Sequence, residues 1–348
     1  MSYIHSVAKA IPNKLSQKQI QNYAKEIFSN SNLPLDRLLT VFENAQIEYR
    51  PVLEKLEWYS TSHSFVEKNE LFLKHALELG SLACEEALKK CSLHPSEIDA
   101  FLVITSSGFV TPTLDARLID ILGLREDVIR LPFTGLGCAG GVFGLARARE
   151  LSLVYPNWKI LVLAVETCTI TFRPSDKSKT NLIAFSLFSD GASALVISNQ
   201  PKKNTIQLLH HKTFKFPNSL RIMGWDVEAD GLQVVFDRSI PSIINSDFIK
   251  YYKLFYQSFS SDIHFKHYLF HPGGKKVLEA FENVLGLSEK IFFYSYKVLR
   301  ECGNLSSPTV YFVIEEFLNS RDFLEGEYGL MVAMGPGFSC EFLLFQTT

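Results

Sequence analysis

A cysteine in a glycine-rich turn is the side chain of this sequence best suited to nucleophilic chemistry. Cys138 lies in the segment Gly-Leu-Gly-Cys-Ala-Gly-Gly, residues 135–141, which leads into an apolar helical pattern. Amides and the dipole at a helix N-terminus stabilise a thiolate, and glycines let a substrate approach the sulfur closely. The turn predicts a cysteine that carries an acyl group as a thioester. A packed, unreactive thiol is the alternative.

A histidine and an asparagine lie in two further turns, in the second half of the chain. His271 follows the apolar strand pattern 268–270 and precedes Pro272, two glycines and a helical pattern. Because α/β sheets hold ligands at the carboxyl ends of their strands, we expect His271 at a ligand site. A histidine that only caps the turn is the alternative. Asn304 precedes the helical pattern that begins near Pro308, and its amide suits an oxyanion hole or, alternatively, an ordinary N-cap.

Two other turns carry weaker signals. The segment 333–338, with Gly-Pro-Gly between two apolar strand patterns, could supply backbone amides to a reacting carbonyl, although turn chemistry alone explains it. The segment 188–192 is interpreted as a strand-to-strand turn. We expect its carboxylate, Asp190, to be structural.

Helical and strand patterns alternate along the chain, which predicts an α/β fold. The expected helices cover 71–91, about 246–260, the residues after Pro272, and 308–319; the expected strands cover 98–104, 160–165, 192–197, 268–270 and a pair around 329–345. Continuous apolar strands are typical of sheets covered on both faces. The polar segment 199–204 breaks regular structure and predicts two halves, 1–203 and 204–348.

Composition excludes several classes of protein. The 348 residues are 47% hydrophobic and 21% charged, which is enough for a large core, and the net charge of −2 offers no strong field to nucleic acid. No apolar stretch reaches about 18 residues, so no membrane span is expected. No signal peptide is recognisable, and the six cysteines and nine histidines form no CxxC or HExxH pattern. We expect a cytoplasmic protein with reduced thiols and no metal.

Taken together, the motifs resemble those of the type III polyketide synthases, the chalcone-synthase-like family of thiolase-fold condensing enzymes. The matching segments, in the order of the family, are GLGCAGG at 135–141, FSDGASAL at 188–195, HPGG at 271–274, GNLSS at 303–307 and GPGF at 335–338. They span nearly the whole chain. The HPGG segment separates it from 3-ketoacyl-ACP synthase III, whose histidine usually lies in His-Gln-Ala-Asn. Segments 108–118 and 223–227 are similar to the bacterial alkylpyrone and alkylresorcinol synthases.

The resemblance implies a fold and a reaction. The fold would be a five-layered, thiolase-like αβαβα arrangement of two related βαβαβαββ halves, in a homodimer that needs coenzyme A thioesters as substrates but no cofactor. Cys138 would take the starter acyl group from an acyl-CoA, with its thiolate paired to His271. His271 and Asn304 would hold the carbonyl of malonyl-CoA while decarboxylation forms an enolate. The enolate would then attack the acyl-Cys138 thioester and extend the chain by two carbons.

The resemblance also implies which residues contact the substrates. Phe188 matches a gatekeeper aromatic that forms an apolar wall beside the malonyl carboxylate and helps CO₂ to leave. Val234 stands where plant enzymes usually have a second phenylalanine, which should widen the route to the cavity. The other expected substrate contacts are Ser106, Thr111, Cys168, Thr171, Ser306, Gly273 and Gly274. For Cys168, a packed core thiol is an equal alternative.

The residues expected to bind coenzyme A and the starter differ from those of the plant enzymes. Arg37 matches one of the basic residues that contact the coenzyme A phosphates, whereas Thr40 and Asn44 stand at others. We therefore expect the nucleotide to be held differently. By resemblance to the bacterial branch, we expect a medium or long fatty acyl-CoA starter and an alkylpyrone or alkylresorcinol product. The alternatives are a 3-ketoacyl-ACP synthase III-like enzyme that performs one condensation, and a non-catalytic scaffold, which the complete trio disfavours.

Overall fold

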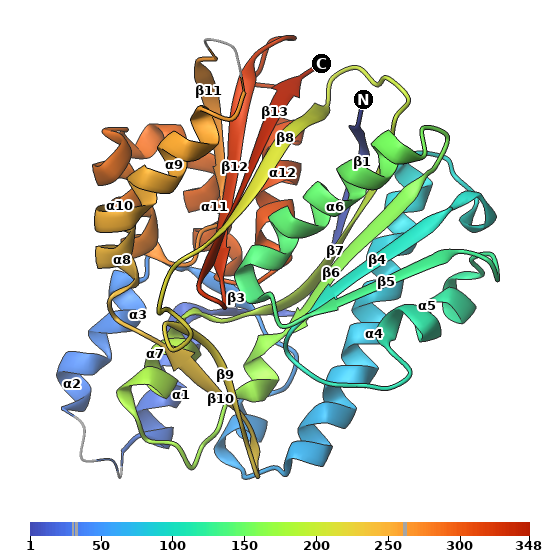
Figure 1. The fold of residues 1–348 in the computed structure, drawn as a ribbon. Helices are drawn as coiled ribbons and strands as arrows, with labels where there is room; N and C mark the ends of the chain where they lie inside the picture. Colours follow the sequence, from blue (N-terminus) through green and yellow to red (C-terminus); the bar gives the residue numbers. More distant parts are fainter. Residues whose placement is uncertain (30, 32–33, 260–262) are drawn as a thin grey trace.

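A long mixed sheet organises the molecule (Figure 1). The computed structural model describes residues 1–29, 31, 34–259 and 263–348, and within them nine strands pair in the order β5-β4-β6-β7-β1-β8-β13-β12-β11. Their bounds are β1 (Tyr3–Ala10), β4 (Ala100–Thr105), β5 (Ile129–Thr134), β6 (Ile160–Thr167), β7 (Asp190–Ser198), β8 (Ile206–Lys215), β11 (Phe265–Phe270), β12 (Tyr328–Gly335) and β13 (Ser339–Thr347).

The two halves of the sheet repeat one strand order. In the first half, β4 is parallel to β6, and β6, β7 and β1 follow as antiparallel neighbours. In the second half, β11 is parallel to β12, and β12, β13 and β8 follow as antiparallel neighbours. β5 adds a parallel edge strand to the first half, and a contact between β1 and β8 joins the two. This repeat confirms the two related halves that the motifs implied.

Helices complete five layers. α4 (Phe65–Lys90) and α5 (Leu114–Leu122) cover the outer face of the first half, and α8 (Ile240–Ile243), α9 (Ile249–Tyr256) and α10 (Lys275–Leu285) cover that of the second. α6 (Gly140–Val154) and α12 (Thr309–Ser320) lie between the halves. Alternation along β12 shows the layering, because Met331 packs toward α6 and α12 whereas Leu330 packs toward the outer helices. The predicted αβαβα fold is therefore confirmed.

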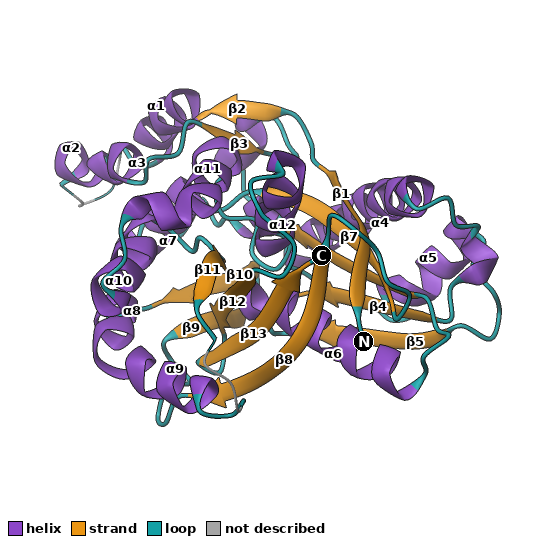
Figure 2. Cartoon of the chain, turned by 90° about the horizontal axis from the view of Figure 1, so that it is seen from above, coloured by secondary structure: helices purple, strands orange, loops and turns teal. Residues whose placement is uncertain are grey.

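A smaller lobe lies at the lower edge of the view in Figure 1 and beside the second half in Figure 2. Its elements are α1 (Gln17–Ile27), α2 (Leu35–Leu38), α3 (Thr40–Asn44), α7 (Lys179–Leu187) and the strand pairs β2 (Lys14–Ser16) with β3 (Tyr49–Pro51) and β9 (Met223–Glu228) with β10 (Gly231–Phe236). Its core contains Phe28, Phe42, Phe172 and Phe185. A further helix, α11 (Phe293–Cys302), precedes α12 in the chain.

Most elements expected from the sequence are present, with two corrections. The expected helix 246–260 begins earlier, at Ile240, contains a π-helical turn at Ile244–Phe248 and ends at Tyr256, while residue 260 lies outside the described residues. The interpretation of 188–192 as a strand-to-strand turn is wrong. Ser178 caps a helix, α7, that ends at Leu187. The segment therefore leads from α7 directly into β7, which begins at Asp190. In the described part of the chain, every helix is too short or too polar to span a bilayer.

Gly141→Ala tests how closely α6 approaches α12. A Cβ atom at Gly141 would lie 2.4 Å from a methyl carbon of Val310 and 2.5 Å from the Ser307 carbonyl oxygen. Because backbone cannot move aside, we expect a loss of about 1–3 kcal/mol in the free energy of unfolding, measured in urea. Gly80→Ala in α4 is the control, because its Cβ would meet the flexible Leu163 side chain at 3.0 Å. A loss as large in Gly80→Ala would contradict this argument.

Candidate active site

Cys138 lies where the sequence predicts it, at the N-terminal end of α6. β5 ends at Thr134, and the chain then turns through Gly135 and Gly137, whose φ angles are +79° and +48°. Residues other than glycine rarely adopt such backbone angles. A 3₁₀ turn over Gly137–Ala139 holds Cys138, which is 5% exposed, and continues into α6. The Gly-Pro-Gly turn at 335–337 packs on this segment, since a Cβ on Gly137 would lie 2.7 Å from Pro336.

Asn304 and His271 reach the same place from the other half. Asn304 lies between α11 and α12, and its Oδ1 is 3.8 Å from the Cys138 sulfur. The same oxygen accepts a bond from the Ser306 amide at 2.8 Å, and Nδ2 donates to the Gly273 carbonyl at 3.1 Å. His271 immediately follows β11 and is 4% exposed. The structure therefore brings the three predicted turns together.

Burial controls the charge of this trio. It raises the pKa of Cys138 to about 12, while Ser306 and Asn304 lower the pKa by hydrogen bonding and the Glu166 carboxylate raises it further. Burial also lowers the pKa of His271 to about 3. Neither ring nitrogen of His271 has a hydrogen-bond partner among the described residues. Burial thus favours a neutral thiol and a neutral imidazole, in contrast to the thiolate that the turn and the resemblance predict, and His271 is the candidate base for the proton of Cys138.

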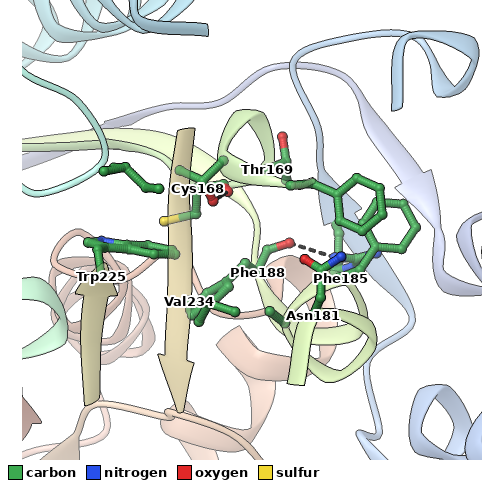
Figure 3. Close-up of a pocket in the computed structure, with 12 residues that line it drawn as sticks. Cys168, Thr169, Asn181, Phe185, Phe188, Trp225 and Val234 are labelled. Atoms are coloured by element: carbon green, nitrogen blue, oxygen red, sulfur yellow. Dashed lines mark hydrogen bonds between the residues drawn. The ribbon is translucent and has the colours of Figure 1, made fainter. Parts of the chain in front are cut away.

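Four of the expected substrate contacts line one pocket, which Figure 3 shows in close-up. These are Cys168, Thr171, Phe188 and Val234, and the pocket is small, with a cavity volume of about 20 Å³. Apolar and aromatic side chains form much of its wall, including Trp225, Leu232, Phe172, Phe185 and Ala184. The Phe188 ring lies 6.0 Å from the Trp225 ring, centroid to centroid. The apolar part of this wall suits contact with an apolar group, and Arg50 and Asn181 contribute polar atoms to the same lining.

The pocket is tied to the trio through backbone. Cys138, His271 and Asn304 are not themselves in its lining. Phe188 and Asn304 instead form a parallel bridge, in which the Asn304 amide donates to the Leu187 carbonyl and the Ser189 amide donates to the Asn304 carbonyl, both at 2.9 Å. The predicted gatekeeper and the predicted oxyanion donor therefore share one rigid connection.

Glu166 is the residue that the sequence analysis missed. It is the second-to-last residue of the buried strand β6. Its carboxylate accepts bonds from the Ser106 amide at 3.0 Å, the Ser106 hydroxyl at 2.8 Å and the Ser307 hydroxyl at 2.8 Å, with the Ser306 hydroxyl at 3.5 Å. Burial raises the pKa of Glu166, and the serine bonds oppose that rise. An acidic residue at the end of a wholly apolar strand was the available signal. Two expected substrate contacts, Ser106 and Ser306, thus bind a carboxylate beside Cys138.

The other expected residues are more scattered. Thr111 is exposed in the loop between β4 and α5, and Arg37 is exposed on α2. Gly273 lies beside Asn304, and Gly274 precedes α10. Asp190 is structural, as expected, because its oxygens accept bonds from the amides of Leu53 and Thr169.

Family comparisons agree with this geometry. The N-terminal domain of the chalcone and stilbene synthases matches residues 47–201, and the C-terminal domain of the same family matches 208–348. The chain belongs to this family, the type III polyketide synthases. Such proteins are acyl-transferring condensing enzymes that perform a decarboxylative Claisen condensation, and this chain is one of them. The family match favours the polyketide synthase prediction over the 3-ketoacyl-ACP synthase III alternative.

Individual relatives align with nearly the whole of this polyketide synthase. A protein of Bacillus subtilis (strain 168) named for chalcone synthase is 34% identical over 364 aligned residues, which cover 99% of each chain. The 1,3,6,8-tetrahydroxynaphthalene synthase of Streptomyces peucetius subsp. caesius is 30% identical, over 96% of this chain and 90% of that protein. The crystal structure of the type III polyketide synthase domain of Steely1, from Dictyostelium, superposes with a TM-score of 0.92 at 27% identity, over 99% of both chains.

Glu166→Gln tests whether this carboxylate acts on the thiol of the polyketide synthase. Removing a negative charge beside Cys138 lowers the pKa of the thiol, so alkylation by iodoacetamide should set in at lower pH than in the wild type. The alkylated fraction of Cys138 is measured by peptide mass spectrometry over a series of pH values. Glu341→Gln is the control. Glu341 is also buried, and burial raises its pKa to about 7, but its carboxyl group does not affect the pKa of Cys138. An unchanged profile for Glu166→Gln would contradict the coupling.

Proposed function

We propose that this polyketide synthase loads a medium or long fatty acyl group from acyl-CoA onto Cys138 and extends it with malonyl-CoA. Closure of the extended chain would give an alkylpyrone or an alkylresorcinol. One observation carries the proposal: Cys138, His271 and Asn304 converge from separate turns of both halves into one buried site beside an apolar pocket. A cysteine, a base and an amide in one buried site are the parts that acyl transfer and enolate formation need.

Loading is a thioester exchange. The neutral imidazole of His271 takes the proton of Cys138, and the sulfur attacks the carbonyl carbon of the acyl-CoA thioester. The carbon–sulfur bond to coenzyme A then breaks, and the leaving thiolate takes the proton from the imidazolium. Burial favours the neutral forms of both groups before this step, so the thiolate would be consumed by attack on the thioester as it forms.

Extension follows on the same sulfur. His271 and the Asn304 Nδ2 group would donate to the thioester oxygen of malonyl-CoA while its carbon–carboxylate bond breaks, releasing CO₂ and leaving an enolate. The apolar face of Phe188 disfavours the charged carboxylate and so favours its loss. The enolate carbon attacks the acyl-Cys138 carbonyl, and the thiolate of Cys138 leaves and is ready for another transfer.

The starter, the nucleotide and the assembly complete the proposal. Val234 and the apolar lining support a fatty acyl starter. Arg37 is an exposed cation that suits a coenzyme A phosphate. A homodimer is supported by the edge strand β5, which among the described residues pairs only with β4, because an open edge is a template for a second copy. Six free cysteines support a cytoplasmic location.

Cys138→Ala separates the two chemical steps. We expect chain extension to stop, because no thioester can form, while malonyl-CoA decarboxylation continues at least in part through His271 and Asn304. Release of labelled CO₂ and mass spectrometry of the products measure the two steps. Cys84→Ala, which removes a buried thiol of the α4 core, is the control and should leave both intact. Full-length polyketide from Cys138→Ala would overturn the assignment of the nucleophile.

Val234→Phe tests the route of the starter. A larger ring on the pocket wall should lower kcat/KM for long starters about tenfold or more relative to short ones. A panel of acyl-CoA esters from hexanoyl to palmitoyl, with malonyl-CoA and product mass spectrometry, gives the preference and the number of extensions. Val235→Phe is the matched control, because the next residue of β10 points to the other face and is outside the pocket lining. An equal fall in kcat/KM for long starters in Val234→Phe and Val235→Phe would contradict the proposed route of the starter.

A further inference from the structure

The C-terminal end of α7 is held by three different segments of the chain. Three consecutive carbonyls lie there, and each accepts one hydrogen bond: Ser186 from Gln17 Nε2 at 2.8 Å, Leu187 from the Asn304 amide at 2.9 Å, and Phe188 from Arg50 Nη1 at 2.6 Å. The last carbonyls of a helix have no partner inside it, so these bonds fix where α7 ends. The dashed line in Figure 3 marks the bond to the Phe188 carbonyl.

Arg50 is a buried cation at this junction. It lies on β3, is 1% exposed and donates from Nε to Gln17 Oε1 at 2.9 Å. Among the described residues no carboxylate oxygen lies within 4.0 Å of its nitrogens, and burial lowers its pKa to about 10. A buried charge is costly unless its hydrogen bonds are made. The contact with the Phe188 carbonyl and the favourable place of a cation at a helix C-terminus offset that cost.

Arg50 also touches the segment that carries Asn304. A Cβ on Gly303 would lie 3.0 Å from Arg50 Cγ and 3.0 Å from the Leu187 carbonyl oxygen. Gly303 has a φ of +67°, which glycine adopts readily. The arginine stem therefore packs against the residue before Asn304, while its guanidinium binds Phe188. Both partners of the Phe188–Asn304 bridge are in this way fixed from one side by one side chain.

We propose that Arg50 is a positioning residue of the condensation: through the Phe188–Asn304 bridge it sets where the Asn304 amide lies relative to Cys138. This inference rests on the proposed function, which gives Asn304 its role as a donor. The physical reason is geometric, since a donor to a developing oxyanion acts only when it is aimed at that oxygen. The Asn304 side chain is already bound on both sides, by Gly273 and Ser306, so a shift of its backbone would move the whole group.

The proposal predicts an unequal effect on the two half-reactions. Loading of the starter depends on Cys138 and His271, and Arg50 forms no hydrogen bond with either among the described residues. Arg50 also lines the pocket, so the test uses lysine, which keeps a positive charge and an aliphatic stem at that wall. Decarboxylation depends in addition on Asn304 and on the wall that Phe188 forms. A displaced bridge therefore slows decarboxylation more than loading. A role in stability alone would lower both rates together, in proportion to the folded fraction.

Arg50→Lys provides the test. Lysine keeps the charge, but its single ammonium cannot reproduce the planar fork that binds Gln17 and Phe188 together. Acyl-enzyme formation is followed by intact-mass spectrometry with decanoyl-CoA alone, and decarboxylation by labelled CO₂ from malonyl-CoA alone. We expect the rate of decarboxylation to fall about tenfold, as is reasonable for a misaligned donor, and loading to change little.

Lys177→Met is the matched control. Lys177 also donates to a carbonyl at a helix end of the lobe, that of Ile27 at 2.7 Å, but it has no hydrogen bond to Phe188 or Asn304. In Lys177→Met, the ratio of the decarboxylation rate to the loading rate should be the same as in the wild type. If Arg50→Lys does not fold, Gln17→Met, which removes the partner of Arg50 Nε, should shift the ratio in the same direction by a smaller factor.

The outcomes are distinct. A parallel loss of both rates in the folded Arg50 or Gln17 variant, or the same change of ratio in Lys177→Met, would overturn the positioning role. A wild-type protein that neither loads decanoyl-CoA nor decarboxylates malonyl-CoA would instead refute the proposed function. A selective loss of decarboxylation in the Arg50 variant, with the control unchanged, supports both.

Discussion

The short backbone bridge between Phe188 and Asn304 is the interaction on which the site depends. It joins the end of α7, in the first half of the chain, to the turn before α12, in the second half. The large sheet and the layer of α6 and α12 bring these turns near one another, and the bridge pairs their backbones directly. Backbone pairing of this kind is insensitive to the side chains present, so it can hold the Asn304 amide in place while the side chains of the neighbouring pocket vary.

Burial gives the same site its second constraint. A neutral thiol, a neutral imidazole and a carboxyl group with a raised pKa lie together, and each would be charged or easily charged in water. Burial disfavours isolated ions here, so proton transfer between neighbouring groups avoids leaving a lone charge. The serine hydroxyls around Glu166 show how the protein compensates locally, by placing donors where the carboxylate needs them.

The sequence predicts most of the architecture because the strands carry long apolar runs and the trio lies in turns that glycine or proline marks. Glu166 escaped notice because its partners Ser106 and Ser307 are distant in the chain. Arg50 lies on a three-residue strand with no periodicity to reveal it. The segment after α7 was assigned wrongly because its turn residues resemble those of a hairpin, and only the capping bond of Ser178 identifies the helix before it. Long-range pairing was the missing information for Glu166 and Arg50, whereas for the segment after α7 it was a local capping bond.

The unequal halves of the sheet have a consequence for assembly. Within the described residues β5 has no counterpart in the second half, so the two ends of the sheet, β5 and β11, differ. If β5 met β11 of another copy, each added copy would leave a fresh end, and a filament would grow. A second copy that meets β5 with its own β5 uses up the same edge on both molecules. Such a complex is closed, and growth stops at two chains.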